Sequence, residues 1–253
     1  MSVVPRRARR MRPINRVPKP DLLGGLTVGP PLSFQRTLAE HAFALHRSRA
    51  GASRDIAGTI KISTSEWFAT HALTVPISGL TADHPELTVE ILTDSSLVDL
   101  SRREADLACR FQPFTTASIV QRRLTTVRYG LFATPEFLNR VGPIEHAGSA
   151  VRLIGMDSAF DGLADIAWMR GLFPQATFAV RSNSRDVQAR ACSEGLGVAV
   201  LPRILGASFG LVQAYAEEPP SRVVWIGYHH DLKQQPRLRV LIDHLCKEVP
   251  VIL

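Results

Sequence analysis

Between residues 58 and 247 the sequence alternates short stretches of β-strand pattern with longer stretches of helical pattern. Residues 59–63 and 87–92 alternate polar and apolar side chains, as strands with one buried face do. Residues 66–83, which lie between them, carry apolar side chains at helical spacing. A helix that joins two strands in this way returns the chain to the same edge of the sheet, so the alternation is typical of a mainly parallel sheet. The sequence therefore predicts an α/β fold.

The same alternation continues in the second half of the chain. A third strand of the first half is predicted over residues 106–111. The predicted strands of the second half are 151–156, 177–181, 197–201 and 223–229. The predicted helices of the second half are 135–141, 166–172, 185–194 and 237–247. Two α/β lobes of roughly a hundred residues each, joined through a β-like stretch at 119–134, predict a hinged cleft between the lobes.

The net charge of +7 comes from the N-terminus. The first twenty residues contain seven basic and no acidic side chains, which leaves 23 basic and 23 acidic residues in the rest of the chain. Residues 1–33 also contain six prolines and show no periodicity, so we expect an irregular segment. A basic arm of this kind either holds phosphate groups without reading bases or is a disordered, solvated start, and both interpretations remain open.

Residues 34–57 carry apolar side chains at helical spacing, and Gly58 follows them. We therefore predict a linker helix over this range, with Leu38 and Leu45 on its apolar stripe. A lone helix with one apolar face is marginal in water. The stripe thus predicts pairing with a second copy of the chain in a homodimer.

The sequence shows no feature of a membrane, secreted or metal-binding protein. No apolar run reaches the roughly 18–20 residues that a membrane span needs, and no apolar stretch follows the basic N-terminus as it would in a secretory signal. We therefore expect a cytoplasmic protein with no membrane partner. Cys109, Cys192 and Cys246 form no CxxC pair and are interpreted as small buried apolar side chains. The adjacent His229 and His230 alone give weak support for a metal, so neither metal nor cofactor is expected.

Small polar residues follow several of the predicted strands. Because ligands of open α/β sheets bind beyond the carboxyl ends of the strands, these residues predict an effector site. Their hydroxyl and amide groups, with the N–H groups at the start of the following helices, suit a small polar anion such as a carboxylate. Arg110 and Phe111 end the third strand and would supply a cation and an apolar wall. The predicted effector-binding residues are Ser63, Thr64, Ser65, Thr93, Ser95, Arg110, Phe111, Asn183 and Ser184.

The alternative for each hydroxyl is an ordinary helix N-cap. Ser63 and Glu66 also have the spacing of a capping box for the helix that follows the first strand. Taken singly, N-caps are the commoner role of such residues. Their convergence at matching strand ends favours ligand binding.

Catalysis is not expected. Residues 206–210 match the pattern GxSxG, and Asp231 and His244 follow Ser208 in the order of a hydrolase triad. That motif requires a strand directly before the serine and a helix directly after it. Here residues 202–205 separate the serine from the nearest predicted strand, and the following residues are extended in pattern. A serine hydrolase that uses Ser208 remains a distant alternative.

Several stretches resemble one family, in combination and in order. Residues 84–90, HPELTVE, resemble a turn and strand written YPxVxLEL, and residues 100–110, LSRREADLACR, resemble LxxREADLAxR. Residues 194–202, EGLGVAVLP, and 230–239, HDLKQQPRLR, resemble the second lobe and closing segment of the same family. The family is that of the LysR-type transcriptional regulators, and the resemblance covers their effector domain over residues 58–247.

The resemblance implies a two-lobed, periplasmic-binding-protein-like fold of type 2 with an effector in the cleft. It implies lobe one at residues 58–128 plus 231–253 and lobe two at 129–230. Most of the strand-end residues chosen above fall where the family holds its ligand. The resemblance also implies dimers or tetramers, in which the helix that carries Leu73 and Ile77 packs on a neighbouring chain, and DNA as a partner.

Members of the family begin with a winged helix-turn-helix ahead of a long linker helix, whereas this chain begins with the irregular residues 1–33. Specific DNA reading needs a helix in the major groove, and the sequence offers no candidate. We therefore expect a LysR-family regulator that senses a small effector and oligomerises but lacks an intact DNA-reading head. The alternative is a stand-alone solute-binding or dominant-interfering fragment with no DNA-binding step.

Overall fold

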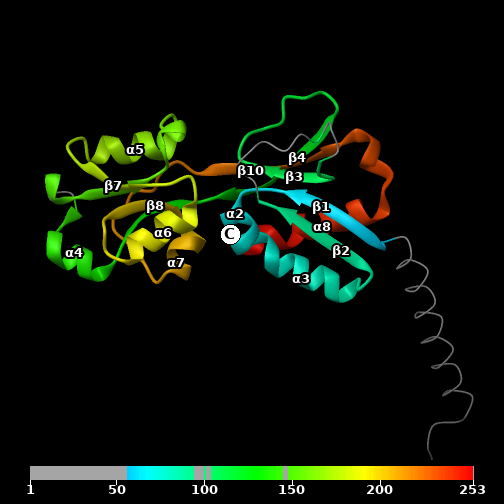
Figure 1. Ribbon diagram of the computed structural model, residues 1–253, viewed down its shortest axis with the longest axis horizontal. Coiled ribbons are helices and arrows are strands. Elements are labelled where there is room, and N and C mark those ends of the chain that lie inside the picture. Colours follow the sequence, from blue (N-terminus) through cyan, green and yellow to red (C-terminus); the bar gives the residue numbers. More distant parts are fainter. Residues whose placement is uncertain (1–55, 94–99, 101–103, 145–147, 253) are drawn as a thin grey trace, which may run out of the picture. The chain divides into compact units, whose positions relative to one another are not determined.

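The computed structural model consists of two α/β lobes, each built on its own five-stranded sheet (Figure 1). The predicted two-lobed α/β fold is confirmed. The segment 1–33 and nearly all of the predicted linker helix, including Leu38 and Leu45, lie outside the residues that the structure describes. No helix among the described residues combines the length and the apolar character needed to cross a membrane. The described residues are 56–93, 100, 104–144 and 148–252.

The first sheet has the strand order β2-β1-β3-β10-β4. β1 pairs in parallel with β2 and β3, and β10 runs antiparallel to both β3 and β4. The parallel pairing of β1 with β2 requires a crossover, which the helices between these two strands supply. The strands of this sheet are β1 Gly58–Ser63, β2 Leu87–Leu92, β3 Leu107–Arg110, β4 Ile119–Val127 and β10 Arg222–His229.

The second sheet repeats this arrangement with the order β7-β6-β8-β5-β9. β6 pairs in parallel with β7 and β8, and β5 runs antiparallel to β8 and β9. Each lobe therefore has three parallel strands followed by two strands in antiparallel pairing. The strands of this sheet are β5 Tyr129–Ala133, β6 Arg152–Gly155, β7 Thr177–Arg181, β8 Val198–Pro202 and β9 Val212–Gln213.

The chain passes between the two sheets twice. β4 leads directly into β5, as the β-like stretch 119–134 predicted, and β9 leads through residues 214–221 into β10. The predicted lobe boundary is wrong for residues 222–229, which had been assigned to lobe two. These residues form β10, which pairs with β3 and β4 of the first sheet. The alternation of side chains along a strand is the same whichever sheet it joins, so the pairing alone decides this boundary.

The helices of the first lobe pack on one another as well as on the sheet. α3 packs against α8, and α8 packs on β4. The imidazole Nε2 of His244 in α8 is hydrogen bonded to the carbonyl oxygen of Pro76 in α3, at 2.8 Å. The helical elements are α2 Glu66–Phe68, the π-helix η1 Ala69–Leu73, α3 Thr74–Asp83, the 3₁₀-helix η6 His230–Gln234 and α8 Pro236–Ile252.

Leu73 and Ile77 belong to the core of the first lobe, where 0% and 9% of their surfaces are exposed. This corrects the prediction that they lie at a dimer interface, because neither side chain offers a surface to a partner. Their helix carries more apolar residues than one sheet contact needs because α8 covers it as well. Val75, in the same helix, is instead 70% exposed.

Three helices of the second lobe match the predicted ranges to within two residues, whereas α7 was not predicted. The Oγ1 atom of Thr134 accepts a hydrogen bond from the backbone N–H of Phe137 at 3.1 Å, which caps α4. After α6, Gly195 has φ 71°, a conformation that glycine adopts without strain, and so ends the helix. The helical elements are α4 Pro135–Val141, the 3₁₀-helices η4 Gly148–Ala150 and η5 Ser158–Phe160, α5 Ala164–Leu172, α6 Arg185–Ser193 and α7 Arg203–Ser208.

Two of the three cysteines are buried apolar side chains, as predicted. Burial raises the pKa of the Cys109 thiol to about 12, and burial likewise raises that of Cys192 to about 12. Both thiols are therefore neutral at physiological pH. Cys246 differs, because it is partly exposed and its Sγ accepts a hydrogen bond from Nε of Arg122 at 3.0 Å.

Gly197 lies where the chain enters β8 beside β6. A Cβ atom at this position would come within 2.1 Å of the carbonyl oxygen of Arg152, far inside van der Waals contact. We expect Gly197→Ala to lower the free energy of unfolding by at least about 1–3 kcal/mol, the usual cost of overpacking, as measured by urea denaturation. Gly171 in α5 is the matched control, since no atom lies within 4 Å of its added Cβ. Gly171→Ala should instead be neutral or stabilise by up to about 1 kcal/mol, and equal losses in both variants would contradict the packing argument.

Candidate functional site

The carboxyl ends of three parallel strands lie level with one another in the first sheet. Ser63 is paired with Leu92 of β2 and with Ala108 of β3. The backbone N–H of Thr64 donates to the carbonyl oxygen of Leu92 at 3.0 Å, so the residues that follow β1 and β2 start from the same edge. Thr93 follows Leu92 at this edge and is exposed, while Ser95 lies outside the described residues.

Arg110, at the end of β3, is bound to the end of β1. Its guanidinium donates to the carbonyl oxygen and to Oγ of Ser63, at 2.9 and 2.8 Å, and to the carbonyl oxygen of Cys109 at 3.1 Å. Burial lowers the pKa of Arg110 from its ordinary value, although the group stays a cation at neutral pH. A guanidinium has five N–H donors, so these three bonds hold the cation in place without using its full donor capacity.

The two residues that follow Ser63 carry buried hydroxyl groups with no hydrogen-bond partner among the described residues. The groups are Oγ1 of Thr64, a residue that is only 1% exposed, and Oγ of Ser65. A buried polar group that makes no hydrogen bond costs about 1–3 kcal/mol, so folded proteins rarely keep one without a functional reason. Both hydroxyls precede α2 at the sheet edge where the sequence predicts a ligand.

Aromatic rings pack together beside the end of β3. Phe111 packs on Trp67 and Phe68, with ring centroids 5.5 and 5.9 Å apart. The guanidinium of Arg222, at the start of β10, lies over the Phe111 ring at 4.9 Å from its centroid. Phe111 is one of the predicted site residues, whereas Trp67 and Arg222 are not, because only the fold brings them to the end of β3.

The second lobe meets this region through the start of α6. Oγ of Ser184 donates to the carboxylate of Glu66 at 3.2 Å, and the imidazole Nε2 of His71 lies 2.8 Å from Oδ1 of Asp186. Ser184 also caps α6, because its Oγ accepts the N–H of Val187 at 3.4 Å. Two pairs of side chains therefore join the lobes beside the strand ends.

The predicted capping box of Ser63 and Glu66 is wrong. The helix begins at Glu66 with Ser65 as its N-cap, and the Ser65 side chain makes no capping hydrogen bond. Ser63 instead bonds to Arg110, and Glu66 bonds across to Ser184. The neighbouring Asn183 is exposed, so of the two residues predicted in the second lobe only Ser184 contacts the first lobe in the described contacts.

A buried ion pair inside the second lobe holds the start of α6. Arg185 and Asp165 are 4% and 1% exposed, and the guanidinium of Arg185 donates to the Asp165 carboxylate. The same guanidinium donates to the carbonyl oxygen of Val200 at 2.9 Å and to Oε1 of Gln188 at 3.0 Å. It also lies over the ring of Tyr129, 5.5 Å from its centroid. This network ties α6 to α5, β8 and β5, and so positions Ser184 at the edge of the lobe.

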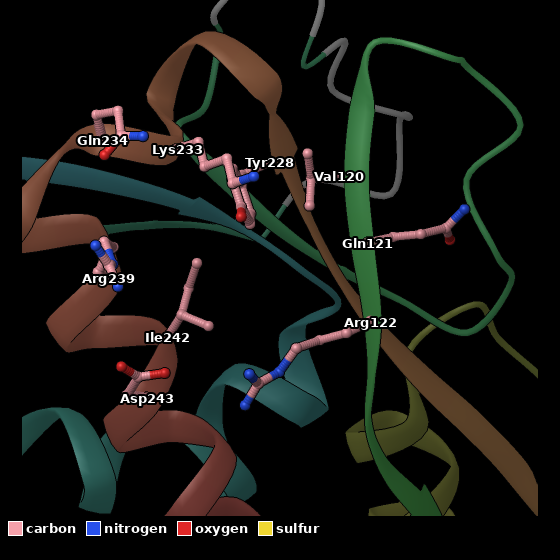
Figure 2. Close-up of a pocket in the computed structure, with 9 residues that line it drawn as sticks. All are labelled: Val120, Gln121, Arg122, Tyr228, Lys233, Gln234, Arg239, Ile242 and Asp243. Carbon is pink, nitrogen blue, oxygen red and sulfur yellow. The ribbon is translucent and has the colours of Figure 1, made fainter.

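A separate cavity of about 280 Å³ lies elsewhere in the first lobe (Figure 2). Its lining includes the cations Arg122, Lys233 and Arg239, with Tyr228 and the carboxylate of Asp243. These side chains come from β4, β10, η6 and α8. None of the predicted effector-binding residues lines it, so the strand-end site and this cavity are different places.

The residues of the GxSxG pattern do not form a hydrolase site. Ser208 ends the helix α7 and is followed by the strand β9, which reverses the order that the motif requires. Its hydroxyl donates to the carbonyl oxygen of Leu205 at 2.9 Å, while His244 is bonded to Pro76 in the other lobe. The described contacts therefore give this serine no histidine to act as its base.

Comparison with known proteins decides the family. The model of the LysR substrate binding domain matches residues 53–249. The chain belongs to the LysR family. The expected resemblance and the two-lobed, periplasmic-binding-protein-like fold of type 2 are confirmed.

Solved structures of LysR-family proteins share this fold. The LysR-type transcriptional regulator CrgA from Neisseria meningitidis superposes with a TM-score of 0.66 at 20% identity, over 85% of this chain and 76% of that one. The C-terminal domains of a LysR family protein from Agrobacterium tumefaciens superpose with a TM-score of 0.63 at 19% identity, over 77% of this chain and 98% of that one.

A sequence relative in Escherichia coli is the uncharacterized HTH-type transcriptional regulator YcaN. It is 32% identical over 95 residues, which are 35% of this chain and 30% of that protein. The match thus spans about a third of the length of this HTH-type relative.

The buried ion pair of this LysR domain gives a test of how the second lobe holds Ser184 in place. Asp165→Asn leaves the Arg185 cation buried without a counter-charge, so we expect a loss of about 3–5 kcal/mol in the free energy of unfolding. The control is Asp161→Asn, because Asp161 pairs with Arg181 and Arg170 but is 44% exposed. An exposed pair contributes at most about 1 kcal/mol, so this variant should unfold nearly as the wild type does in urea. Similar losses in the two variants would refute the buried role of Asp165.

Proposed function

We propose that this LysR-family chain senses a small anionic effector at the carboxyl ends of β1, β2 and β3. The observation that carries the proposal is the pair of buried hydroxyls, on Thr64 and Ser65, that make no hydrogen bond among the described residues. They belong to the two residues that follow Ser63, which holds the Arg110 cation at the sheet edge. A carboxylate accepts hydrogen bonds from hydroxyl and guanidinium donors together, so one small anion would satisfy all three groups.

The surroundings favour a carboxylate attached to a flat apolar group. The rings of Trp67 and Phe111 supply an apolar wall, and Arg222 adds a second cation over Phe111. Ligand sites of this kind combine apolar lining with a few well-placed polar groups that set the orientation of the ligand. The proposed effector class is therefore an aromatic or short apolar carboxylate, which benzoate represents in an experiment.

An effector at this site would change the arrangement of the two lobes relative to each other. The pairs Ser184–Glu66 and His71–Asp186 join the lobes next to the strand ends. A ligand that binds better to one arrangement of the lobes shifts the population towards that arrangement. In a complete LysR-type regulator such a shift would change how the protein acts on DNA, which we propose as the role of this domain. A stand-alone solute-binding protein is the alternative that the same site supports.

A thermal shift with benzoate tests the effector site. A ligand that binds only the native state adds about 2.7 kcal/mol at a hundredfold excess over Kd, so the melting temperature of the wild-type chain should rise with benzoate concentration. Thr64→Val keeps the shape of the side chain and removes the hydroxyl. This variant should lose at least tenfold in benzoate affinity, yet melt no earlier than the wild type without ligand, because it removes an unbonded buried hydroxyl.

Thr125→Val is the matched control, since Thr125 is a buried threonine on β4, 9% exposed, outside the proposed site. It should bind benzoate as the wild type does. If Thr64→Val melts several degrees earlier in the absence of benzoate, the hydroxyl has a structural role and the assignment fails. A wild type whose melting temperature does not respond to benzoate or to other small carboxylates would also overturn the proposed effector class.

We also propose that the chain forms a homodimer, as the LysR family implies, through exposed apolar side chains. Val75 on α3 is 70% exposed, and Val187 on α6 is 48% exposed. A symmetric contact between α3 of one copy and α6 of the other would cover both side chains in each chain. Exposed apolar side chains on the helices of both lobes are the support for this interface.

Val75→Glu should dissociate the dimer, because it places a charge in the centre of an apolar contact. Sedimentation velocity at micromolar concentration should show a monomer, while the far-UV circular dichroism and the melting curve stay close to those of the wild type. Ile77→Glu, two residues along, charges a core position and should unfold the lobe instead. A Val75→Glu chain that sediments as a dimer would exclude α3 from the interface.

A further inference from the structure

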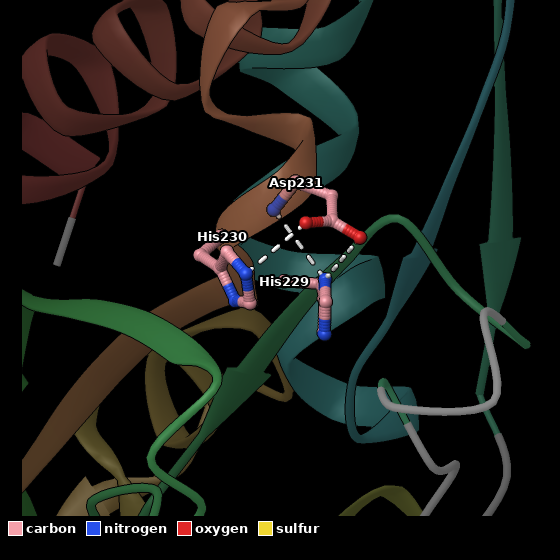
Figure 3. A group of neighbouring side chains, drawn as sticks. All are labelled: His229, His230 and Asp231. Carbon is pink, nitrogen blue, oxygen red and sulfur yellow. Dashed lines mark hydrogen bonds and ion pairs between the residues drawn. The ribbon is translucent and has the colours of Figure 1, made fainter.

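Three adjacent residues at the end of β10 bring metal-binding atoms together. They are His229, His230 and Asp231, and their ligand atoms all lie within 4.8 Å of one another. Figure 3 shows the Asp231 carboxylate with one dashed line to each imidazole. Nε2 of His230 lies 3.1 Å from Oδ1 of Asp231, and Nδ1 of His229 lies 3.4 Å from Oδ2. The carboxylate therefore faces both rings.

These distances match the spacing of ligands around a tetrahedral zinc ion. With bonds of about 2.0–2.2 Å to nitrogen and oxygen, two ligand atoms on such an ion lie roughly 3.3–3.5 Å apart. Both nitrogen–oxygen pairs of the cluster are already near this separation. His230 is 59% exposed, so its ring has room to complete the approach.

The backbone orients the His230 ring for this purpose. The carbonyl oxygen of Ser118 accepts the backbone N–H of His230 at 2.9 Å and lies 3.1 Å from its Nδ1. An oxygen that only accepts requires the proton on Nδ1, which leaves the lone pair of the neutral ring on Nε2, towards Asp231. Metal-ligating histidines are usually held in this way, with the second ring nitrogen donating to a carbonyl or carboxylate oxygen.

The His229 ring has the complementary orientation. Its Nδ1 accepts the backbone N–H of Asp231 at 3.4 Å, so the lone pair of this ring is on Nδ1 and also faces Asp231. This bond is long, and a metal ion would replace it at little cost. The ring is well packed, with 16% of the side chain exposed. Two imidazole lone pairs and one carboxylate therefore converge on the same place.

We infer that His229, His230 and Asp231 form a binding site for a divalent transition-metal ion of the zinc class. Two imidazole nitrogens and one carboxylate suit such ions better than Mg²⁺ or Ca²⁺, which prefer oxygen ligands alone. Water would complete the coordination, because the cluster is open to solvent. The site would join the end of β10 to the residue before β4, since the Ser118 carbonyl holds one of the ligands.

The metal site does not depend on the proposed effector. β10 runs antiparallel to β3, so its last residues lie at the opposite edge of the sheet from the carboxyl ends of β1 and β3. Arg222, which belongs to the effector site, begins the same strand that His229 ends. Loss of one site therefore leaves the other in place, and the two proposals fail separately.

Zinc competition with a chromophoric chelator tests the inference on the full chain after treatment with EDTA and dialysis. The wild type should bind one Zn²⁺ per chain, and Co²⁺ in its place should give the visible absorption of a site with nitrogen ligands. His230→Gln and Asp231→Asn should each lower the affinity for Zn²⁺ at least tenfold and abolish the Co²⁺ band. Both are surface changes, so their melting curves without metal should follow that of the wild type.

His84→Gln and Asp83→Asn are the matched controls, because Asp83 and His84 form another adjacent histidine–aspartate pair, at the end of α3. Both control variants should bind Zn²⁺ as tightly as the wild type. Absence of one-to-one binding by the wild type would overturn the site. So would equal weakening by the control variants, or unchanged binding in both His230→Gln and Asp231→Asn.

Discussion

The first lobe depends on the backbone pairing of β10, which enters between β3 and β4 after the chain has built the whole second lobe. Without it, β3 and β4 would each expose a row of unpaired N–H and C=O groups, which are costly to bury. The pairing also fixes the end of the second connection between the lobes, which runs from β9 to β10. Because the facing edges of β3 and β4 are paired only when this distant strand returns, the first sheet is complete only after the chain has passed through the second lobe.

The same strand carries functional groups at both of its ends. Arg222 at its start lies over Phe111, beside the proposed effector site, and His229 at its end belongs to the proposed metal site. Its antiparallel direction places these ends at opposite edges of the sheet. A displacement of β10 relative to β3 would therefore move Arg222 and His229 together, although each site is built from its own side chains.

In the second lobe, the buried Arg185 makes several contacts, whereas the neighbouring residue at the edge of the lobe makes few. Arg185 is buried with four groups around its guanidinium: Asp165, Gln188, the Val200 carbonyl and the Tyr129 ring. One residue earlier, Ser184 meets the first lobe through a single 3.2 Å hydrogen bond to Glu66. Strong bonds inside a lobe and few bonds between lobes are what a ligand-controlled rearrangement requires, because the ligand must then shift only a small difference in free energy.

The sequence by itself determined the α/β fold, the bounds of most strands and of α6, and the strand-end residues. These follow from local rules: the period of side-chain burial, helix capping, and the conformational freedom of glycine. Only the tertiary structure decided which sheet takes β10, that Leu73 and Ile77 are core rather than interface, and that Ser63 holds Arg110 instead of capping a helix. It also added Trp67 and Arg222 to the proposed effector site, and showed the Ser118 carbonyl that orients His230. Each of these depends on a contact between residues far apart in the chain, and such contacts follow from strand pairing and packing, which leave no periodic signal in the sequence.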